Sequence, residues 1–405
     1  MTVRNQDFDQ KSFLVNFVVV LIIGLAVRLF LAFVVPPAYD IWAWQEYANY
    51  WKTGHLSPYQ NFETVPSFRY SPFWFFFVVL SSLFSQSTGL SFGFSIRLPI
   101  IIADLFLLWV IARSCKKLNL NKKTSLIIVA GFFLNPVSLL TSGLYGQFDN
   151  FSVLFALLAW YAGSFTVKNR SFLSFLFLTL SIAAKHFTVM LVPAFAYLQK
   201  SWLKKLLVLC AAPLLFFVSI LPFAGLDGIL TIVQRLFQYN LHAGYWGWSG
   251  VICRSILFFT HIDLIQEPWF KYLDHFNSLL YFGILIASYW ITKQFDLLDS
   301  ILIVFLIFYS FTTQIAPQYT IWIIPFAALR PNRYFYAYSL VGGVQVATFY
   351  YVHYHWWRHD PLLGVIANLI PETFILFRYL TWFVCALWLV HMLGLFGKHR
   401  KQLNA

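Results

Sequence analysis

Repeated apolar runs, most of them close to 20 residues long, constrain the fold of this chain more than any other feature of its sequence. A helix needs about 20 apolar residues to cross ~30 Å of hydrocarbon, where it satisfies its own backbone hydrogen bonds. The clear runs lie at 13–35, 96–112, 124–140, 150–167, 206–222, 276–292, 297–313, 334–352 and 373–396. A shorter run covers 319–329, and 171–198 is interrupted by Lys185-His186, which indicates two short helices. The sequence therefore predicts an all-α polytopic membrane protein with about twelve transmembrane helices.

The composition agrees with a membrane protein and excludes a set of soluble domains. Hydrophobic residues make up 60% of the chain and charged residues only 11%, against roughly 25% charged residues in soluble globular proteins. No Gly/Ser-rich linker, repeat or low-complexity segment divides the sequence, so we expect one integral membrane domain over 1–405. The four cysteines are scattered and indicate neither a disulfide framework nor a zinc site.

The net charge of +13 is explained by topology. Lys and Arg cluster in the short loops between apolar runs, most densely at 113–123, as cytoplasmic loops do under the positive-inside rule. All these loops share one side if the run 71–84, which is only about 14 residues long, does not cross the membrane. Both termini are then cytoplasmic, and the outer face, with its first loop at 36–95 and its large loop at 223–275, is close to neutral. We therefore expect a membrane and no nucleic acid as partner.

Asp40 is the first candidate for chemistry, because it follows the first apolar run among aromatic residues suited to the headgroup level. A partly desolvated carboxylate there suits a general base. An alternative role, compatible with the first, is capping of a helix that starts at Ile41.

A second polar group lies in the turn before the run 150–167. Gln147, Asp149 and Asn150 carry amide or carboxylate groups that can hydrogen-bond the hydroxyls of a sugar. Asp149 alone is also explained as a helix cap.

Lys185-His186 is the third candidate, because a lysine within an apolar stretch is costly and indicates an anionic partner. A phosphate group fits this role. The alternative is a lysine that snorkels from the end of a short helix. Arg69, Arg235 and Arg254 are further cations on the outer face.

Arg28 and Asp104 lie within apolar runs, each roughly 11–12 Å below the outer surface at 1.5 Å per residue. Their equal depth and opposite charge predict a structural ion pair inside the membrane. His353 and His355 are two residues apart, a spacing that does not place two ligands on one helix face, so we expect no metal at His353, His355 and His359.

Several motifs resemble one family in order and spacing. Asp40, Gly54, Ser57-Pro58-Tyr59 and Arg69-Tyr70-Ser71-Pro72 resemble the first outer loop of the mannosyltransferases that add the first mannose to GPI anchors. Three further blocks recur in the same order: Leu134-Asn135-Pro136 leading to Asp149, Lys185-His186-Phe187 before Pro193, and Pro317-Gln318-Tyr319 with Trp322 and Pro325. More broadly, the chain is similar to GT-C glycosyltransferases, membrane enzymes that use polyprenyl-phosphate sugars.

The resemblance implies a GT-C-like fold with juxtamembrane helices in the first outer loop, a polyprenyl-phosphate hexose donor, with mannose the expected sugar, and transfer on the non-cytoplasmic face. Asp40 matches the catalytic acidic residue of that loop. The expected substrate-binding residues are Gln147, Asp149, Arg69, Tyr70, Lys185, His186, Arg235, Arg254, Gln318 and Tyr319. The GPI enzymes have Asp-x-Asp in this loop, whereas this chain has Ala38 in place of the first Asp. We therefore expect no metal or other cofactor, and we carry over only the reaction class.

The sequence thus predicts inverting, single-displacement transfer of a hexose to a lipid-linked or extracytoplasmic acceptor, in a bacterial plasma membrane. An O-antigen-type polymerase or ligase is one alternative, and a polyprenyl-lipid transporter or flippase is another. Transporters often show inverted repeats and ionisable groups near the midplane. Here no repeat is visible and the acidic residues cluster on the outer face, which disfavours transport.

Overall fold

The computed structural model is helical throughout the part that it describes, residues 2–55, 57–59, 68, 70–165, 170–237, 246–267, 269–270, 272–358 and 369–394. The longest helices are α1 (Thr2–Val34), α4 (Phe92–Lys117), α10 (Trp202–Phe237), α12 (Tyr272–Thr292), α15 (Arg333–Arg358) and α17 (Leu369–Gly394). Those of intermediate length are α2 (Tyr39–Lys52), α3 (Pro72–Thr88), α5 (Lys122–Phe133), α7 (Asp149–Phe165), α8 (Arg170–Ala184), α11 (Gly247–Thr260) and α13 (Leu297–Phe311). Short turns of helix are α6 (Pro136–Leu139), η1 (Leu140–Tyr145), η2 (His186–Leu191), α9 (Val192–Tyr197), η3 (Leu264–Gln266), η4 (Pro317–Ile321) and α14 (Ile324–Ala328).

Four segments within these residues are long and apolar enough to cross a membrane: Ser12–Val34, Phe92–Lys117, Trp202–Gly225 and Thr373–Gly394. A bent pair, Lys122–Phe133 with Pro136–Tyr145, adds a fifth candidate. Large apolar side chains of α1 face outwards, with Phe30 63% and Phe33 70% exposed. Such a surface is stable only against hydrocarbon, so the chain is an integral membrane protein. The number of twelve spans remains a prediction.

Two breaks in the helices follow from local sequence. The predicted run 124–140 bends by 41° between α5 and α6, where Pro136 lacks a backbone N–H and Asn135 caps the new helix by accepting a hydrogen bond from Val137 N at 3.0 Å. The predicted break at Lys185 is confirmed: α8 ends at Ala184, Lys185 is extended at φ −156°, and η2 follows.

The predicted ion pair inside the membrane is also confirmed. Arg28 Nε lies 2.6 Å from Asp104 Oδ2, and both side chains are fully buried. The guanidinium also donates to Phe133 O at 2.7 Å and to Ser138 Oγ at 2.7 Å, and Asn150 Nδ2 donates to the other oxygen of Asp104. Both charges therefore have partners. Since the pair and the partners of Arg28 lie on α1, α4 and the α5–α6 bend, the pair joins these three elements.

Replacing Asp104 with Asn should lower the free energy of unfolding by about 3–5 kcal/mol, since it leaves the Arg28 charge buried and uncompensated. Thermal unfolding in detergent measures this loss. Asp296→Asn is the matched control: Asp296 also pairs with an arginine, Arg330 at 2.5 Å, but is 52% exposed. That control should cost no more than about 1 kcal/mol. Equal losses in the two variants would contradict the proposed role of burial.

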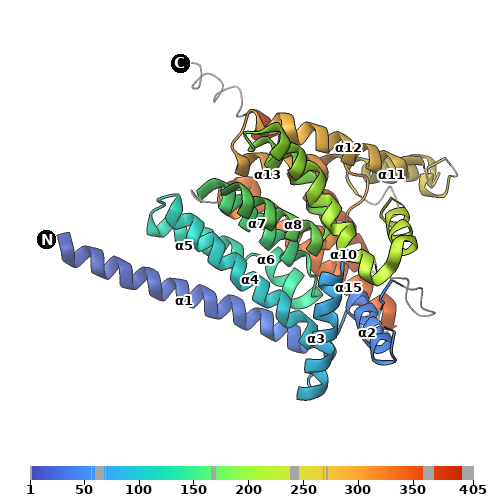
Figure 1. Ribbon diagram of the computed structural model, residues 1–405, viewed down its shortest axis with the longest axis horizontal. Coiled ribbons are helices and arrows are strands. Elements are labelled where there is room, and N and C mark those ends of the chain that lie inside the picture. The colour runs from blue at the N-terminus through green and yellow to red at the C-terminus, as the bar shows by residue number, and fades with distance from the viewer. Residues whose placement is uncertain are drawn as a thin grey trace.

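The first outer loop begins with helices that lie at one end of the molecule. Figure 1 shows α2 and α3 beside the C-terminal end of α1. The helix expected from Ile41 is present as α2, which begins two residues earlier and ends at Lys52, and the chain then turns at Gly54, whose φ is +95°. Ser71 caps α3 by accepting a hydrogen bond from Phe73 N at 3.3 Å. That α3 does not cross the membrane stays a prediction.

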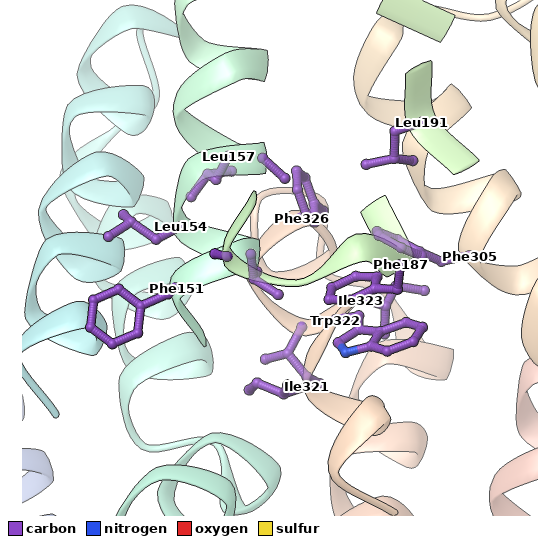
Figure 2. Close-up of a cluster of buried hydrophobic side chains, with 14 of the residues drawn as sticks. Phe151, Leu154, Leu157, Phe187, Leu191, Phe305, Ile321, Trp322, Ile323 and Phe326 are labelled. Carbon is purple, nitrogen blue, oxygen red and sulfur yellow. The ribbon is translucent and has the colours of Figure 1, made fainter. Parts of the chain in front are cut away.

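A core of aromatic and aliphatic side chains lies next to these outer elements and comes from distant parts of the chain (Figure 2). Within it, Trp322 stacks on Phe187 with ring centroids 3.6 Å apart and an interplanar angle of 3°. Trp322 follows η4 and Phe187 belongs to η2, so their stacking fixes the two elements that carry Tyr319 and Lys185.

Candidate active site

Asp40 is oriented by two hydrogen bonds from another part of the chain. Its Oδ2 accepts from Gln147 Nε2 at 2.6 Å and from Tyr145 Oη at 3.1 Å. The capping role is wrong, because α2 is preceded by Ala38 and has no side-chain cap. Asp40 instead lies in the first turn of α2, where the helix dipole favours a negative charge. Its carboxylate is half-buried.

The turn that supplies Tyr145 and Gln147 is shaped by Gly146. This glycine has φ +68°, and a Cβ on it would lie 2.9 Å from Ile41 Cδ1 and 3.0 Å from Arg97 Cγ. Only glycine allows both the left-handed backbone and the close approach to α2 and α4.

Gly146→Ala should therefore cost more than the usual left-handed strain of about 1–2 kcal/mol, because overpacking adds roughly 1–3 kcal/mol. Gly89→Ala is the control, since Gly89 has a similar φ of +73° with no atom within 4 Å of its added Cβ. Thermal unfolding of both variants separates strain from crowding. A loss in Gly146→Ala no larger than in Gly89→Ala would show that the close approach is unimportant.

Arg97 is a residue of this site that the sequence reasoning did not identify. It is buried in α4 and donates to Leu144 O at 2.6 Å and to Val35 O at 3.0 Å. It thus ties the end of α1 to the residue that precedes Tyr145. Its position within the apolar run 96–112 was the available signal, because an arginine in such a run needs partners.

Asp149 and Lys185 form a second, more deeply buried group. Lys185 Nζ lies 2.7 Å from Asp149 Oδ2, with side chains 5% and 0% exposed. Trp322 Nε1 donates to Asp149 Oδ1 at 2.6 Å. The snorkelling alternative for Lys185 is wrong, because its ammonium is buried and paired. Both oxygens of Asp149 bind side chains far away in sequence, so capping does not account for this residue.

Three aromatic rings surround the same ammonium. Lys185 Nζ lies 4.9 Å from the ring centroid of Phe148, 5.3 Å from that of Tyr319 and 5.7 Å from that of Tyr70. These distances allow cation–π attraction. Tyr70 is fixed by Tyr59, whose hydroxyl donates to Tyr70 O at 2.8 Å. Burial raises the pKa of Tyr59, which keeps that hydroxyl a donor.

The remaining predicted residues differ in their surroundings. Gln318 is 8% exposed, and its Oε1 has no hydrogen-bond partner among the described residues. The ring of His186 lies 6.2 Å from that of Phe216. Arg254 is exposed on α11, and no contact among the described residues joins it to Asp40 or Lys185. Outside the described residues or side chains lie Arg69, Arg235, His353, His355 and His359.

The three polar residues of the turn have separate partners. Gln147 binds Asp40, Asp149 binds Lys185, and Asn150 binds Asp104 of the structural ion pair. Asn150 therefore belongs to the fold, whereas the first two residues belong to the site. Within the described part of the chain, no three His, Cys, Asp or Glu side chains are grouped as metal ligands.

The comparisons with known proteins find similarity at the level of structure. No protein-family model matches the chain, and no curated protein matches it. Among solved structures, the crystal structure of ArnT from Cupriavidus metallidurans bound to undecaprenyl phosphate is similar over 95% of this chain and 78% of that chain. The TM-score is 0.47 and the sequence identity is 13%.

Proposed function

We propose that the chain is a GT-C-type glycosyltransferase that moves a hexose from a polyprenyl-phosphate donor to a lipid-linked or extracytoplasmic acceptor. The observation that supports this most directly is that adjacent residues of the chain contact a carboxylate and an ammonium group. An oriented carboxylate, Asp40, is held by Gln147, and Gln147 adjoins Phe148, which contacts the caged ammonium of Lys185. A base and a cation held close together are what displacement of a phosphate by a hydroxyl requires.

In the proposed reaction, Asp40 removes the proton from an acceptor hydroxyl as its oxygen bonds to the anomeric carbon of the hexose. The bond from that carbon to the phosphate oxygen breaks, and the polyprenyl phosphate leaves with the electron pair. Attack opposite the leaving group inverts the anomeric configuration. Tyr145 and Gln147 keep the carboxylate aimed during this step, so that little reorganisation is needed.

Lys185 is the proposed contact of the phosphate. Its ammonium has three N–H donors, and the ion pair with Asp149 uses one of them. Asp149 balances this charge while no phosphate is bound, since a buried charge without a counter-charge is costly. Tyr70, Tyr319, Gln318 and His186 lie on the segments around this pair, and we propose that they line the donor site.

Mannose is the proposed sugar, and transfer independent of a metal ion is proposed from Ala38 replacing the first Asp of the family's motif. The proposed setting is a bacterial plasma membrane with the site on its extracytoplasmic face, where the prenyl chain can remain in the bilayer. Residues 36–95 and 223–275 would supply the loops around the substrates, with Arg69, Arg235 or Arg254 as further phosphate contacts.

Transfer of labelled mannose by the purified protein in detergent tests the proposal. The donor is polyprenyl-phosphate mannose, the acceptor is octyl mannoside, and the reaction is run with and without EDTA. We expect a labelled disaccharide product in both reactions. A nucleotide-linked mannose should give none. Failure of the polyprenyl donor, or transfer only from an oligosaccharide-linked lipid, would overturn the proposal, the latter in favour of a polymerase or ligase.

A further inference from the structure

Two fully buried polar side chains, on the packed elements α15 and η1, have no hydrogen-bond partners among the described residues. Both side-chain polar atoms of Gln345 lack a partner, and so does Thr141 Oγ1. Leaving a buried polar group unpaired costs about 1–3 kcal/mol, and such groups are few in native proteins. A pair of them on facing elements therefore indicates a polar ligand.

Gln345 lies on the face of α15 that packs against the site. Positions 338, 342, 345 and 349 fall on one side of a helix, because their spacing follows the 3.6-residue repeat. Tyr338 Oη donates to Thr320 O at 2.9 Å, and the ring of Phe349 lies 5.9 Å from that of Tyr145. A Cβ on Gly342 would lie 3.2 Å from Val137 Cγ2.

Thr141 lies opposite, between the two places where α15 touches the segment α6–η1. Val137, Thr141 and Tyr145 are spaced by four residues, about one turn of this segment, so they share a face. Thr141 O also accepts from Gln147 N at 3.0 Å. The Thr141 hydroxyl is therefore one turn from Tyr145 and adjoins the turn that orients Asp40.

Gln318 carries a third unpaired polar atom, on an element that packs against both η1 and α15. That element is η4, and the Oε1 atom of Gln318 is buried without a described partner. The next residue, Tyr319, contacts Lys185. Three elements that pack against one another thus each carry one of these side chains.

We propose that Thr141, Gln318 and Gln345 form a buried subsite that hydrogen-bonds the hydroxyls of a sugar ring. Two carboxamides and a hydroxyl provide donors and acceptors without charge, which fits a neutral polyhydroxy group and not a phosphate or a cation. A site built in this way discriminates strongly, because a ligand without the matching hydroxyls leaves its polar groups unpaired. The subsite rests on the proposed function and deepens it.

The subsite is tested by lipid binding to the Asp40→Asn protein, which prevents turnover. The probes are polyprenyl-phosphate mannose and polyprenyl phosphate without the sugar. We expect the lipid with the sugar to bind more tightly than the lipid without it. Gln345→Leu should reduce this ratio of affinities at least tenfold. Thr141→Val should reduce it less. Gln199→Leu is the matched control, since Gln199 is also buried, at 6% exposure against 0% for Gln345, but donates to Phe195 O. It should leave the ratio unchanged.

Thermal unfolding of each variant excludes a loss of fold, and Gln345→Leu should be at least as stable as the unmodified chain because it removes an unpaired amide. A kinetic measurement distinguishes whether the sugar in the subsite belongs to the donor or to the acceptor. If Gln345→Leu instead raises the KM for octyl mannoside at least tenfold and leaves donor binding intact, the subsite holds the acceptor. Unchanged donor binding and unchanged KM in a folded Gln345→Leu protein would overturn the subsite and leave the proposed function standing. If the unmodified chain neither binds nor uses the polyprenyl donor, both fail.

Discussion

Asp40→Asn should reduce hexose transfer by roughly 10²- to 10⁴-fold, the usual contribution of a general base. Asparagine has nearly the same shape and still offers an oxygen to Gln147 and Tyr145, so the turn around Gly146 should keep its position. We expect the temperature of unfolding in detergent to change little. Initial rates of labelled mannose transfer measure the effect.

Glu46→Gln is the control for this substitution, because it also converts a carboxylate to an amide on α2. Among the described residues, Glu46 accepts a single hydrogen bond, which is long and exposed and comes from Asn49 at 3.4 Å. Its replacement should leave transfer unchanged. Near-normal turnover in Asp40→Asn, or an equal loss in Glu46→Gln, would show that Asp40 is not the base.

Asp149→Asn should destabilise the protein by about 3–5 kcal/mol, since it leaves Lys185 charged at 5% exposure without a counter-ion. Lys185→Met should have a similar cost, because Asp149 then becomes the unpaired charge. The double variant removes both charges and should recover much of the loss. Thermal unfolding of the four proteins forms a double-mutant cycle that isolates the coupling between the two residues.

The aromatic rings around Lys185 make a separate contribution to the free energy of unfolding. Lys205→Met estimates the size of such a contribution. Lys205 lies 5.7 Å and 5.8 Å from the ring centroids of Tyr197 and Tyr289 and has no ion pair among the described residues. Its loss should cost no more than about 1 kcal/mol. Additive losses in the cycle, with no recovery in the double variant, would contradict a buried ion pair. Transfer should fall in every variant that lacks Lys185.

Features that depend on local sequence or on membrane depth could be predicted. The pairing of Arg28 with Asp104 followed from their equal depth, because a buried charge in hydrocarbon has few possible partners. The break at Lys185 followed from the polar dipeptide alone. The helix at the start of the first outer loop followed from the resemblance, which implies juxtamembrane helices there.

Features that depend on long-range packing could not be predicted. Nothing in the sequence indicates that Gln147 turns towards Asp40 while Asn150 turns towards Asp104, because both are amides in one turn. Arg97 was missed for a different reason: its partners are backbone carbonyl groups, which every residue possesses. The bend after Phe133 was missed because the run 124–140 was interpreted as one span, although Asn135-Pro136 within it is typical of the start of a new helix.

The position of Phe148 in the chain affects how the site responds to motion of the surrounding helices. It stands between Gln147, which binds the base, and Asp149, which binds the cation. Two peptide units of fixed length therefore span the two halves of the site, and this span cannot exceed ~7 Å. Bilayers of different thickness would tilt or slide the surrounding helices. The two peptide units would still limit the separation of Gln147 and Asp149, and so of the two charged groups that these residues bind. Membrane composition should thus alter substrate entry more than the chemical step.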